Sequence, residues 1–127
     1  MSNRSGEKLQ RLQQELGIVA AVDNNQVMSE AEYIILAVKP QQFPLVCSAL
    51  TQKPQKGQAV ISIMAGLSMA AITEQLGEVA LFRAMPNTPA KIGWGMTGVS
   101  AGELVSETQK QVVQEIFDSV GQTIFIE

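Results

Sequence analysis

The sequence predicts an α/β protein with a doubly wound, mostly parallel sheet that carries helices on both faces. Short apolar runs alternate along the chain with longer amphipathic segments. The segments between the runs are long enough for helical crossovers, which parallel strands require. The 127 residues suffice for one domain, and 46% hydrophobic against 17% charged residues can bury a core. We therefore expect residues 1–127 to form a single domain.

The composition excludes several classes of function. Nine Lys and Arg residues against twelve Asp and Glu give a net charge of −3 without any charged block. This balance argues against nucleic acid and membrane surfaces as partners. Cys47 is the single cysteine and histidine is absent, which excludes internal disulfides, cysteine metal clusters and imidazole-based triads. With no long apolar run and a polar start, we expect a cytoplasmic protein.

The first half of the chain is predicted to contain two helices and one strand. Ser5 can cap a helix over Glu7–Leu16, because three leucines share one face of that segment. The polar residues Asp23–Asn25 predict a turn. Tyr33–Val38 is apolar on both faces, which indicates a central parallel strand covered by helices on both sides. A second amphipathic helix is predicted over Gln42–Leu50.

The middle of the chain predicts a strand, a helix and a second strand. Ala59–Met64 is a buried strand by its apolar run, and Ser68 can cap a helix that ends at Gly77. Val79–Ala84 is the next strand. The segment Met85–Gly95 is too rich in Pro and Gly for regular structure, and long loops of this kind are more often functional than idle.

The last third predicts two strands around a helix. Met96–Ala101 reads as a short strand, with an antiparallel direction left open. Ser106 and Gln109 form a capping box ahead of an amphipathic helix, which is the clearest helix signal in the chain. Gln122–Ile126 is the final strand.

Three unusual segments follow three of the predicted strands. They are Lys39-Pro40, Ala65-Gly66 and Met85–Ala90. In open parallel sheets, ligands bind beyond the carboxyl ends of the strands. We therefore expect these three segments to line one crevice.

The same segments carry a family resemblance. Ala37-Val38-Lys39-Pro40-Gln41, Ser62-Ile63-Met64-Ala65-Gly66 and Arg83-Ala84-Met85-Pro86-Asn87-Thr88-Pro89-Ala90 resemble the Rossmann-like dinucleotide-binding domain of pyrroline-5-carboxylate reductase. Each motif alone is common, but three in this order on strand ends are specific. The resemblance covers nearly the whole chain.

The resemblance implies an activity and a cofactor. The family reduces the C=N bond of 1-pyrroline-5-carboxylate to L-proline with NADPH or NADH, without a protein nucleophile. A basic residue near the adenosine ribose, here Arg4, favours NADPH. No catalytic or metal-binding residue is implied. The cofactor-binding residues implied are Ser2, Asn3, Arg4, Asn24, Ala37, Val38, Lys39, Pro40, Ala65, Gly66 and Asn87.

The resemblance also implies a domain truncated at both ends. Family members begin with a strand and a Gly-x-Gly-x-x-Gly type turn that receives the pyrophosphate. They continue beyond the last strand into a helical domain, which forms the dimer and contributes to the substrate site. We therefore expect this chain to be part of a larger, homo-oligomeric enzyme.

Several alternatives remain open. Lys39 is either a phosphate anchor or a solvated lysine, and the resemblance favours binding, chiefly through its backbone. Asn87 is both a common turn residue and a candidate pocket residue. The chain itself is alternatively a catalytically silent fragment or a self-associating module, since a lost central strand leaves unpaired backbone. Another imine or hydroxyacid oxidoreductase domain is a third alternative.

Overall fold

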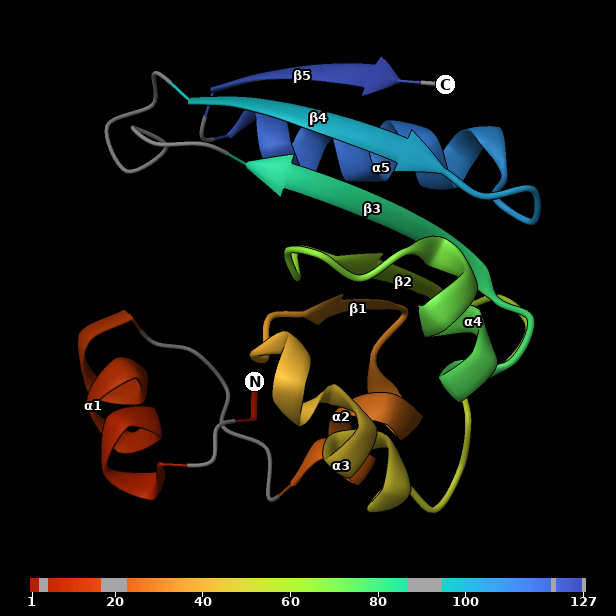
Figure 1. Cartoon of the computed structure of the whole chain (residues 1–127). Coiled ribbons are helices and arrows are strands. Elements are labelled where there is room, and N and C mark those ends of the chain that lie inside the picture. The colour runs from red at the N-terminus through yellow and green to blue at the C-terminus, as the bar shows by residue number, and fades with distance from the viewer. Residues whose placement is uncertain (3–4, 17–22, 87–94, 120, 127) are drawn as a thin grey trace.

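The core of the protein is a five-stranded, mostly parallel sheet with the strand order β1-β2-β3-β4-β5 (Figure 1). The computed structural model describes residues 1–2, 5–16, 23–86, 95–119 and 121–126. β1, β2 and β3 are parallel, β4 is antiparallel to β3, and β5 is parallel to β4. The predicted class and the antiparallel strand are both confirmed. The strands are β1 (Tyr33–Leu36), β2 (Ala59–Ser62), β3 (Ala80–Pro86), β4 (Gly95–Ala101) and β5 (Gly121–Ile126).

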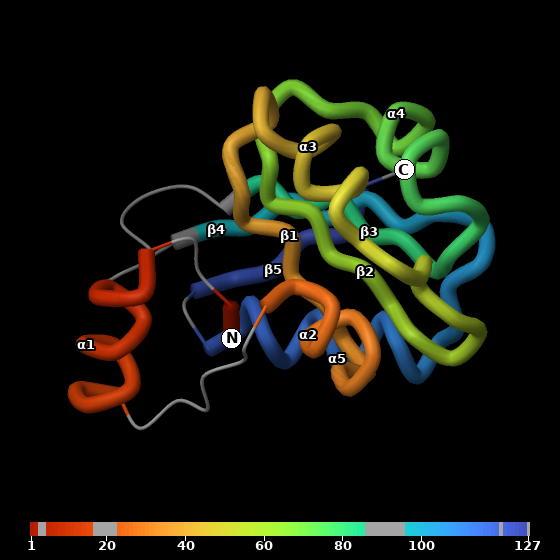
Figure 2. Tube along the Cα trace, turned by 90° about the horizontal axis from the view of Figure 1, so that it is seen from below, coloured from red at the N-terminus to blue at the C-terminus, as the bar shows by residue number. Residues whose placement is uncertain are grey.

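Helices cover both faces of this sheet, as the sequence predicts. In Figure 2, α3 and α4 lie on one side of the strands and α5 lies on the other. α1 stands apart from the sheet in both views. The helices are α1 (Gly6–Leu16), α2 (Asn24–Glu30), the short 3-10 helix η1 (Pro40–Gln42), α3 (Phe43–Ser48), α4 (Met69–Leu76) and α5 (Glu107–Asp118).

Two apolar clusters fill the two sides of the sheet. All four side chains of β2 are buried, and successive residues point to opposite faces. Val60 belongs to the cluster beneath α3 and α4, and Ile61 belongs to the cluster beneath α5. Phe82 of β3 is fully buried in the second cluster beside Val113 of α5. β2 and β3 are therefore the strands covered on both faces.

Within the described sheet, the strand at Tyr33 does not have the central position predicted for it. β1 is an edge strand of the described sheet and pairs on one side only, with β2. Ile34 and Leu36 are buried, but Ile35 points to the other face and is 48% exposed. An apolar run indicates burial but does not reveal how many neighbours a strand has. In this sheet no described helix covers the side chain of Ile35.

The predicted turn at Asp23 is also wrong, because a helix begins there. The backbone of Asp23 is extended, and its Oδ1 accepts a hydrogen bond of 3.0 Å from the Gln26 N–H. Asp is a preferred N-cap residue because its side chain satisfies a free N–H of the first turn. The polar residues expected to form a turn are thus the cap and first turn of α2.

Helix α1 forms where predicted, but none of its residues is fully buried. The Ser5 hydroxyl accepts a 3.2 Å hydrogen bond from the Lys8 N–H, which confirms the predicted cap. Leu9 and Leu12 are half-buried, and Leu16 is 69% exposed. The apolar stripe predicted from the sequence is therefore present but only partly covered.

The capping box before α5 supplies a stability prediction. Ser106 Oγ accepts from the Gln109 N–H at 3.1 Å, and Gln109 Oε1 accepts from the Ser106 N–H at 2.9 Å. Ser106→Ala removes the first bond and should lower the free energy of unfolding by about 1 kcal/mol. Urea unfolding followed by circular dichroism measures the loss. Glu103→Ala, an exposed change outside the helix, is the control, and an equal loss there would contradict the prediction.

Candidate functional site

The carboxyl ends of β1, β2 and β3 meet at one edge of the sheet. Leu36 of β1 is in register with Ser62 of β2, and the Ile63 N–H donates to the Leu36 carbonyl at 3.2 Å. Ser62 is in register with Arg83 of β3. The segments that follow β1 and β2 therefore leave the sheet side by side, which is where ligands bind in open parallel sheets.

The first segment is an exposed loop that enters a 3-10 turn. Ala37 and Lys39 are exposed, whereas Val38 and Pro40 are half-buried. Pro40 begins η1, and Lys39 precedes it with extended backbone and no side-chain cap. A proline at this position forces the residue before it out of helical geometry. The lysine thus lies at the sheet edge as an exposed cation. This position is compatible with a phosphate anchor and equally with a solvated lysine.

The second segment is a turn with open space above it. The buried Ser62 hydroxyl accepts a 3.2 Å hydrogen bond from the Met64 N–H, which bends the chain away from the sheet. Ala65 and Gly66 follow and are exposed. Gly66 has a φ of +81°, and a Cβ atom added there would meet no described atom within 4 Å. Such backbone favours glycine and leaves room for a ligand to approach closely.

Ser62 is a site residue to which the sequence analysis gave no role. It is 1% exposed and is the only hydroxyl within the apolar run of β2. Because a buried polar group requires a partner, a lone serine at the end of a buried strand indicates a structured turn. That signal was available from the sequence.

The third segment begins later than predicted. β3 extends to Pro86, which is in register with Thr97, and Met85 is in register with Gly98. These two residues belong to a strand and not to a loop, because β4 returns antiparallel and extends the pairing. Met85 is 59% exposed at this end of the sheet. Asn87 lies outside the described residues.

The predicted contacts to the adenosine end are only partly described. Ser2 is half-buried ahead of α1, and Asn3 and Arg4 lie outside the described residues. Asn24 is the exposed first residue of α2. No side-chain hydrogen bond joins Asn24 to any residue that the structure describes. Its role in binding stays a prediction.

Asn25, the residue after Asn24, connects the start of α2 to the rest of the chain by side-chain hydrogen bonds. Asn25 Oδ1 accepts a 2.7 Å hydrogen bond from the Thr51 N–H, and its Nδ2 donates to the Ala49 carbonyl at 3.2 Å. Both partners follow α3. The start of α2 is thus anchored to the end of α3, and the hydrogen bonds do not link it to the loops after β1 and β2.

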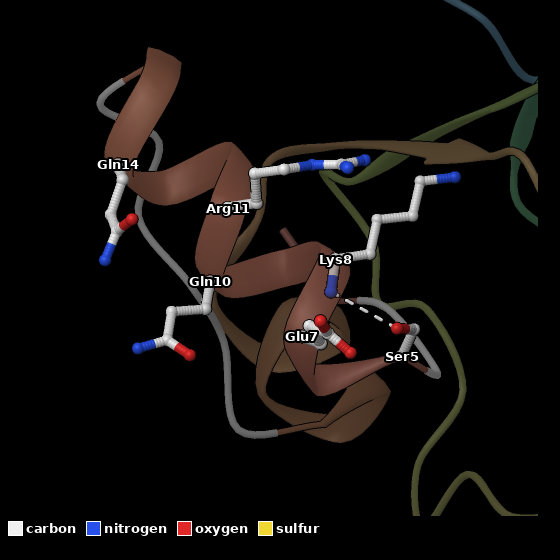
Figure 3. A pocket seen from close by; sticks show the side chains of 6 residues that line it. All are labelled: Ser5, Glu7, Lys8, Gln10, Arg11 and Gln14. Atoms are coloured by element: carbon white, nitrogen blue, oxygen red, sulfur yellow. Dashed lines mark hydrogen bonds between the residues drawn. The ribbon is translucent and has the colours of Figure 1, made fainter.

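A hollow of about 560 Å³ is lined by residues of α1 and its cap (Figure 3). Lys8 and Arg11 extend to one side of the helix, and Gln10 and Gln14 extend to the other. One exposed helix and its cap supply every side chain of its lining. It is therefore an open groove without opposing walls, and the strand-end edge is the better candidate for ligand binding.

Cys47 is not part of the site and supplies a second prediction. It packs half-buried against the cluster beneath α3. Burial raises the pKa of its thiol, and the charge of Lys53 lowers it by less. Because the thiolate is the reactive form, iodoacetamide should react several-fold more slowly with the folded chain at neutral pH than with the urea-unfolded chain. Mass spectrometry over time measures both rates, and equal rates would contradict the prediction.

The described residues include no metal-binding group that could carry out chemistry at this edge of the sheet. No group of three or more Cys, Asp or Glu side chains in the described ranges could hold a metal ion. The described helices include none that is long and apolar enough to cross a membrane. The fold is Rossmann-like, and an exposed glycine turn and a lysine lie at adjacent parallel strand ends, which is where folds of this class bind their ligands.

Comparison with known proteins agrees with this class. A family model described as NADP oxidoreductase, coenzyme F420-dependent, matches residues 1–66, and the chain belongs to this family. Pyrroline-5-carboxylate reductase of Vibrio alginolyticus is 37% identical over 117 residues, which cover 91% of this chain and 43% of that enzyme. The resemblance drawn from the three strand-end motifs is thereby confirmed.

Solved structures give the same result. A pyrroline-5-carboxylate reductase from Coxiella burnetii superposes with a TM-score of 0.89 at 34% identity, covering 99% of this chain and 47% of the other. The pyrroline carboxylate reductase of Plasmodium falciparum, solved with NADP bound, gives a TM-score of 0.84 at 26% identity over 99% and 45%. The chain thus spans less than half the length of these relatives.

Proposed function

We propose that this chain is the dinucleotide-binding part of an NADPH-dependent enzyme that reduces 1-pyrroline-5-carboxylate to L-proline. The observation that carries the proposal is the open turn at Ala65 and Gly66 beside the loop at Lys39. Relatives of similar sequence and fold are named as pyrroline-5-carboxylate reductases, and one was solved with NADP bound. NADH is the alternative cofactor.

The residues at the strand ends fit a dinucleotide. Gly66 leaves space for close backbone approach, and Ala65 beside it adds only a methyl group. Lys39 supplies an exposed positive charge, which suits a phosphate. Ala37, Val38 and Pro40 would form the wall across from Ala65. When bound, the dinucleotide supplies the hydride.

The remaining task of the chain is to hold the ligand in place. Reduction of an imine requires no protein nucleophile, because the protonated C=N bond is already electrophilic. A site without histidine is compatible with that chemistry. Alignment of the reacting atoms then accounts for most of what the protein contributes. Ser2, Asn3, Arg4, Asn24 and Asn87 are proposed to complete the cofactor site.

The open edge of β1 supports a second candidate function, a self-associating module without activity. Among the described strands β1 pairs with β2 alone, and Ile35 is 48% exposed beside the other edge of β1. Such edges favour pairing with another chain. Under this proposal, the chain would associate through β1 and would not bind the dinucleotide.

Titrating the chain with NADPH while sizing it in solution separates the two candidates. Saturable binding by the monomer supports the cofactor-binding proposal, and association without binding supports the module. A chimera in which this chain replaces the matching part of the Vibrio alginolyticus enzyme tests the reaction itself. Oxidation of NADPH that depends on 1-pyrroline-5-carboxylate is expected. A folded chimera that binds NADPH but does not oxidise it would refute the assigned substrate.

The same proposal extends to the location, pathway and assembly of the whole enzyme. We propose that the whole enzyme acts in the cytoplasm, in proline biosynthesis, and that it is a homo-oligomer without nucleic acid or membrane partners. The scattered charge of the sequence supports the last point. Cell fractionation and light scattering of the chimera are the corresponding tests.

A further inference from the structure

The connection from β2 to α4 holds two exposed residues between buried neighbours. Ala65 and Gly66 are exposed, whereas Ile63 and Leu67 are half-buried and Met64 is 4% exposed. Ile63 packs against the cluster beneath α5, and Met64 and Leu67 contribute to the cluster beneath α3 and α4. The exposed pair, Ala65 and Gly66, is therefore the tip of a connection that is attached to the core on both sides.

A serine hydroxyl sets the course of the backbone just before this tip. The register of β2 ends at Ser62, and the Ile63 N–H still donates to the Leu36 carbonyl of β1 at 3.2 Å. The Met64 N–H is buried and donates to the Ser62 Oγ at 3.2 Å. A hydroxyl that accepts from the N–H two residues later forms a local turn. Because a buried N–H requires a partner, this bond fixes where the chain turns away from the sheet.

Ser62 acts on the tip without reaching the open space above it. Its side chain is 1% exposed, in a strand whose four residues are all buried. Gly66, by contrast, is exposed, and a Cβ atom added there would meet no described atom within 4 Å. A ligand over the strand ends would therefore touch the tip and not the Ser62 hydroxyl. Any effect of this hydroxyl on binding has to pass through the turn.

We propose that Ser62 is a positioning residue for the dinucleotide, because its bond to the Met64 N–H holds Ala65 and Gly66 in the orientation that binds the cofactor. This inference rests on the proposed function. Without the hydroxyl, the buried N–H loses its partner, and the chain regains one only by shifting the turn or by admitting water. A tip that has to be reordered on binding holds its ligand more weakly than a tip that is already in place.

Two serine-to-alanine variants of the full chain test the proposal by NADPH titration. Ser62→Ala should raise the NADPH dissociation constant at least about fivefold. Ser68→Ala is the matched control, because Ser68 Oγ accepts a 3.1 Å hydrogen bond from the Ala71 N–H at the other end of the same connection. That bond caps α4, so its loss should lower the urea midpoint and leave the dissociation constant within about twofold. Equal weakening of NADPH binding by both changes would overturn the proposal.

Ser62→Thr separates the hydroxyl from the stability of the strand. Threonine keeps the hydrogen-bond acceptor but adds a methyl group at a fully buried position, so the urea midpoint should fall. The NADPH dissociation constant should nevertheless stay within about twofold of that of the unaltered chain. A folded Ser62→Thr variant that binds NADPH as weakly as Ser62→Ala would contradict the proposal. If circular dichroism shows that Ser62→Thr does not fold, the comparison of Ser62→Ala with Ser68→Ala still decides.

Hydrogen exchange of the Met64 amide, followed by NMR without any ligand, tests the positioning step itself. The exchange rate should rise at least about tenfold in Ser62→Ala and stay close to that of the unaltered chain in Ser68→Ala. Weaker NADPH binding by Ser62→Ala without faster exchange would mean that the hydroxyl contacts the cofactor directly, which overturns the positioning role.

The titration also distinguishes failure of this inference from failure of the proposed function. An unaltered chain that does not bind NADPH would refute the proposed function and this inference with it. An unaltered chain that binds NADPH no more tightly than Ser62→Ala would refute this inference alone.

Discussion

Phe82→Ala is expected to destabilise the protein far more than the loss of the Ser106 cap. Phe82 is fully buried between β3 and α5, and its removal would leave a cavity in the second apolar cluster. Such truncations cost about 3–5 kcal/mol, whereas whole domains are stable by only about 5–15 kcal/mol. The variant should therefore be partly unfolded at room temperature or unfold at much lower urea concentration.

Urea unfolding followed by tryptophan fluorescence and circular dichroism measures this loss. Leu45→Ala is the control, because Leu45 is 73% exposed and its truncation should change the free energy of unfolding by less than about 0.5 kcal/mol. A loss for Phe82→Ala below about 1 kcal/mol would mean that this cluster is loosely packed, which contradicts the structure.

Gly66→Val is expected to have the largest effect on NADPH binding. Its φ of +81° strains any side chain, and the added atoms would occupy the space over the strand ends. Gly57→Val is a matched control, since Gly57 has a φ of +97° and equally open surroundings but precedes β2. The two changes should each cost about 1–2 kcal/mol in stability.

Only the change at Gly66 should affect the cofactor. We expect the NADPH dissociation constant to rise at least about tenfold for Gly66→Val, which corresponds to about 1.4 kcal/mol, and to stay within about twofold for Gly57→Val. Calorimetric or fluorescence titration of both variants is the measurement. Equal dissociation constants would place the cofactor away from the turn after β2.

Local signals in the sequence predicted the elements that depend on neighbouring residues. Ser106 and Gln109 define the start of α5 because both halves of a capping box lie three residues apart. Gly77 ends α4 with a φ of +83°. Helices commonly end on a glycine in this conformation, so the residue type alone predicts the end of the helix. Asp23 carried an equally local signal, but the asparagines after it favoured a turn.

Long-range arrangement was harder to predict. The apolar run at Tyr33 indicated burial, yet the position of β1 in the sheet depends on which other strands pair with it. The site was predictable where it follows from strand direction, because parallel strands bring Lys39 and Gly66 to one edge.

Helix α1 is expected to unfold locally while the rest of the chain stays folded. With no buried residue, its eleven residues depend on their own hydrogen bonds and the Ser5 cap. Isolated helices of this length are marginal in water. Its amide protons should therefore exchange with solvent long before those of β2 and β3, through local fraying that leaves the sheet intact. We therefore expect the protein to combine a slowly exchanging sheet with an N-terminal helix that opens and closes almost independently of it.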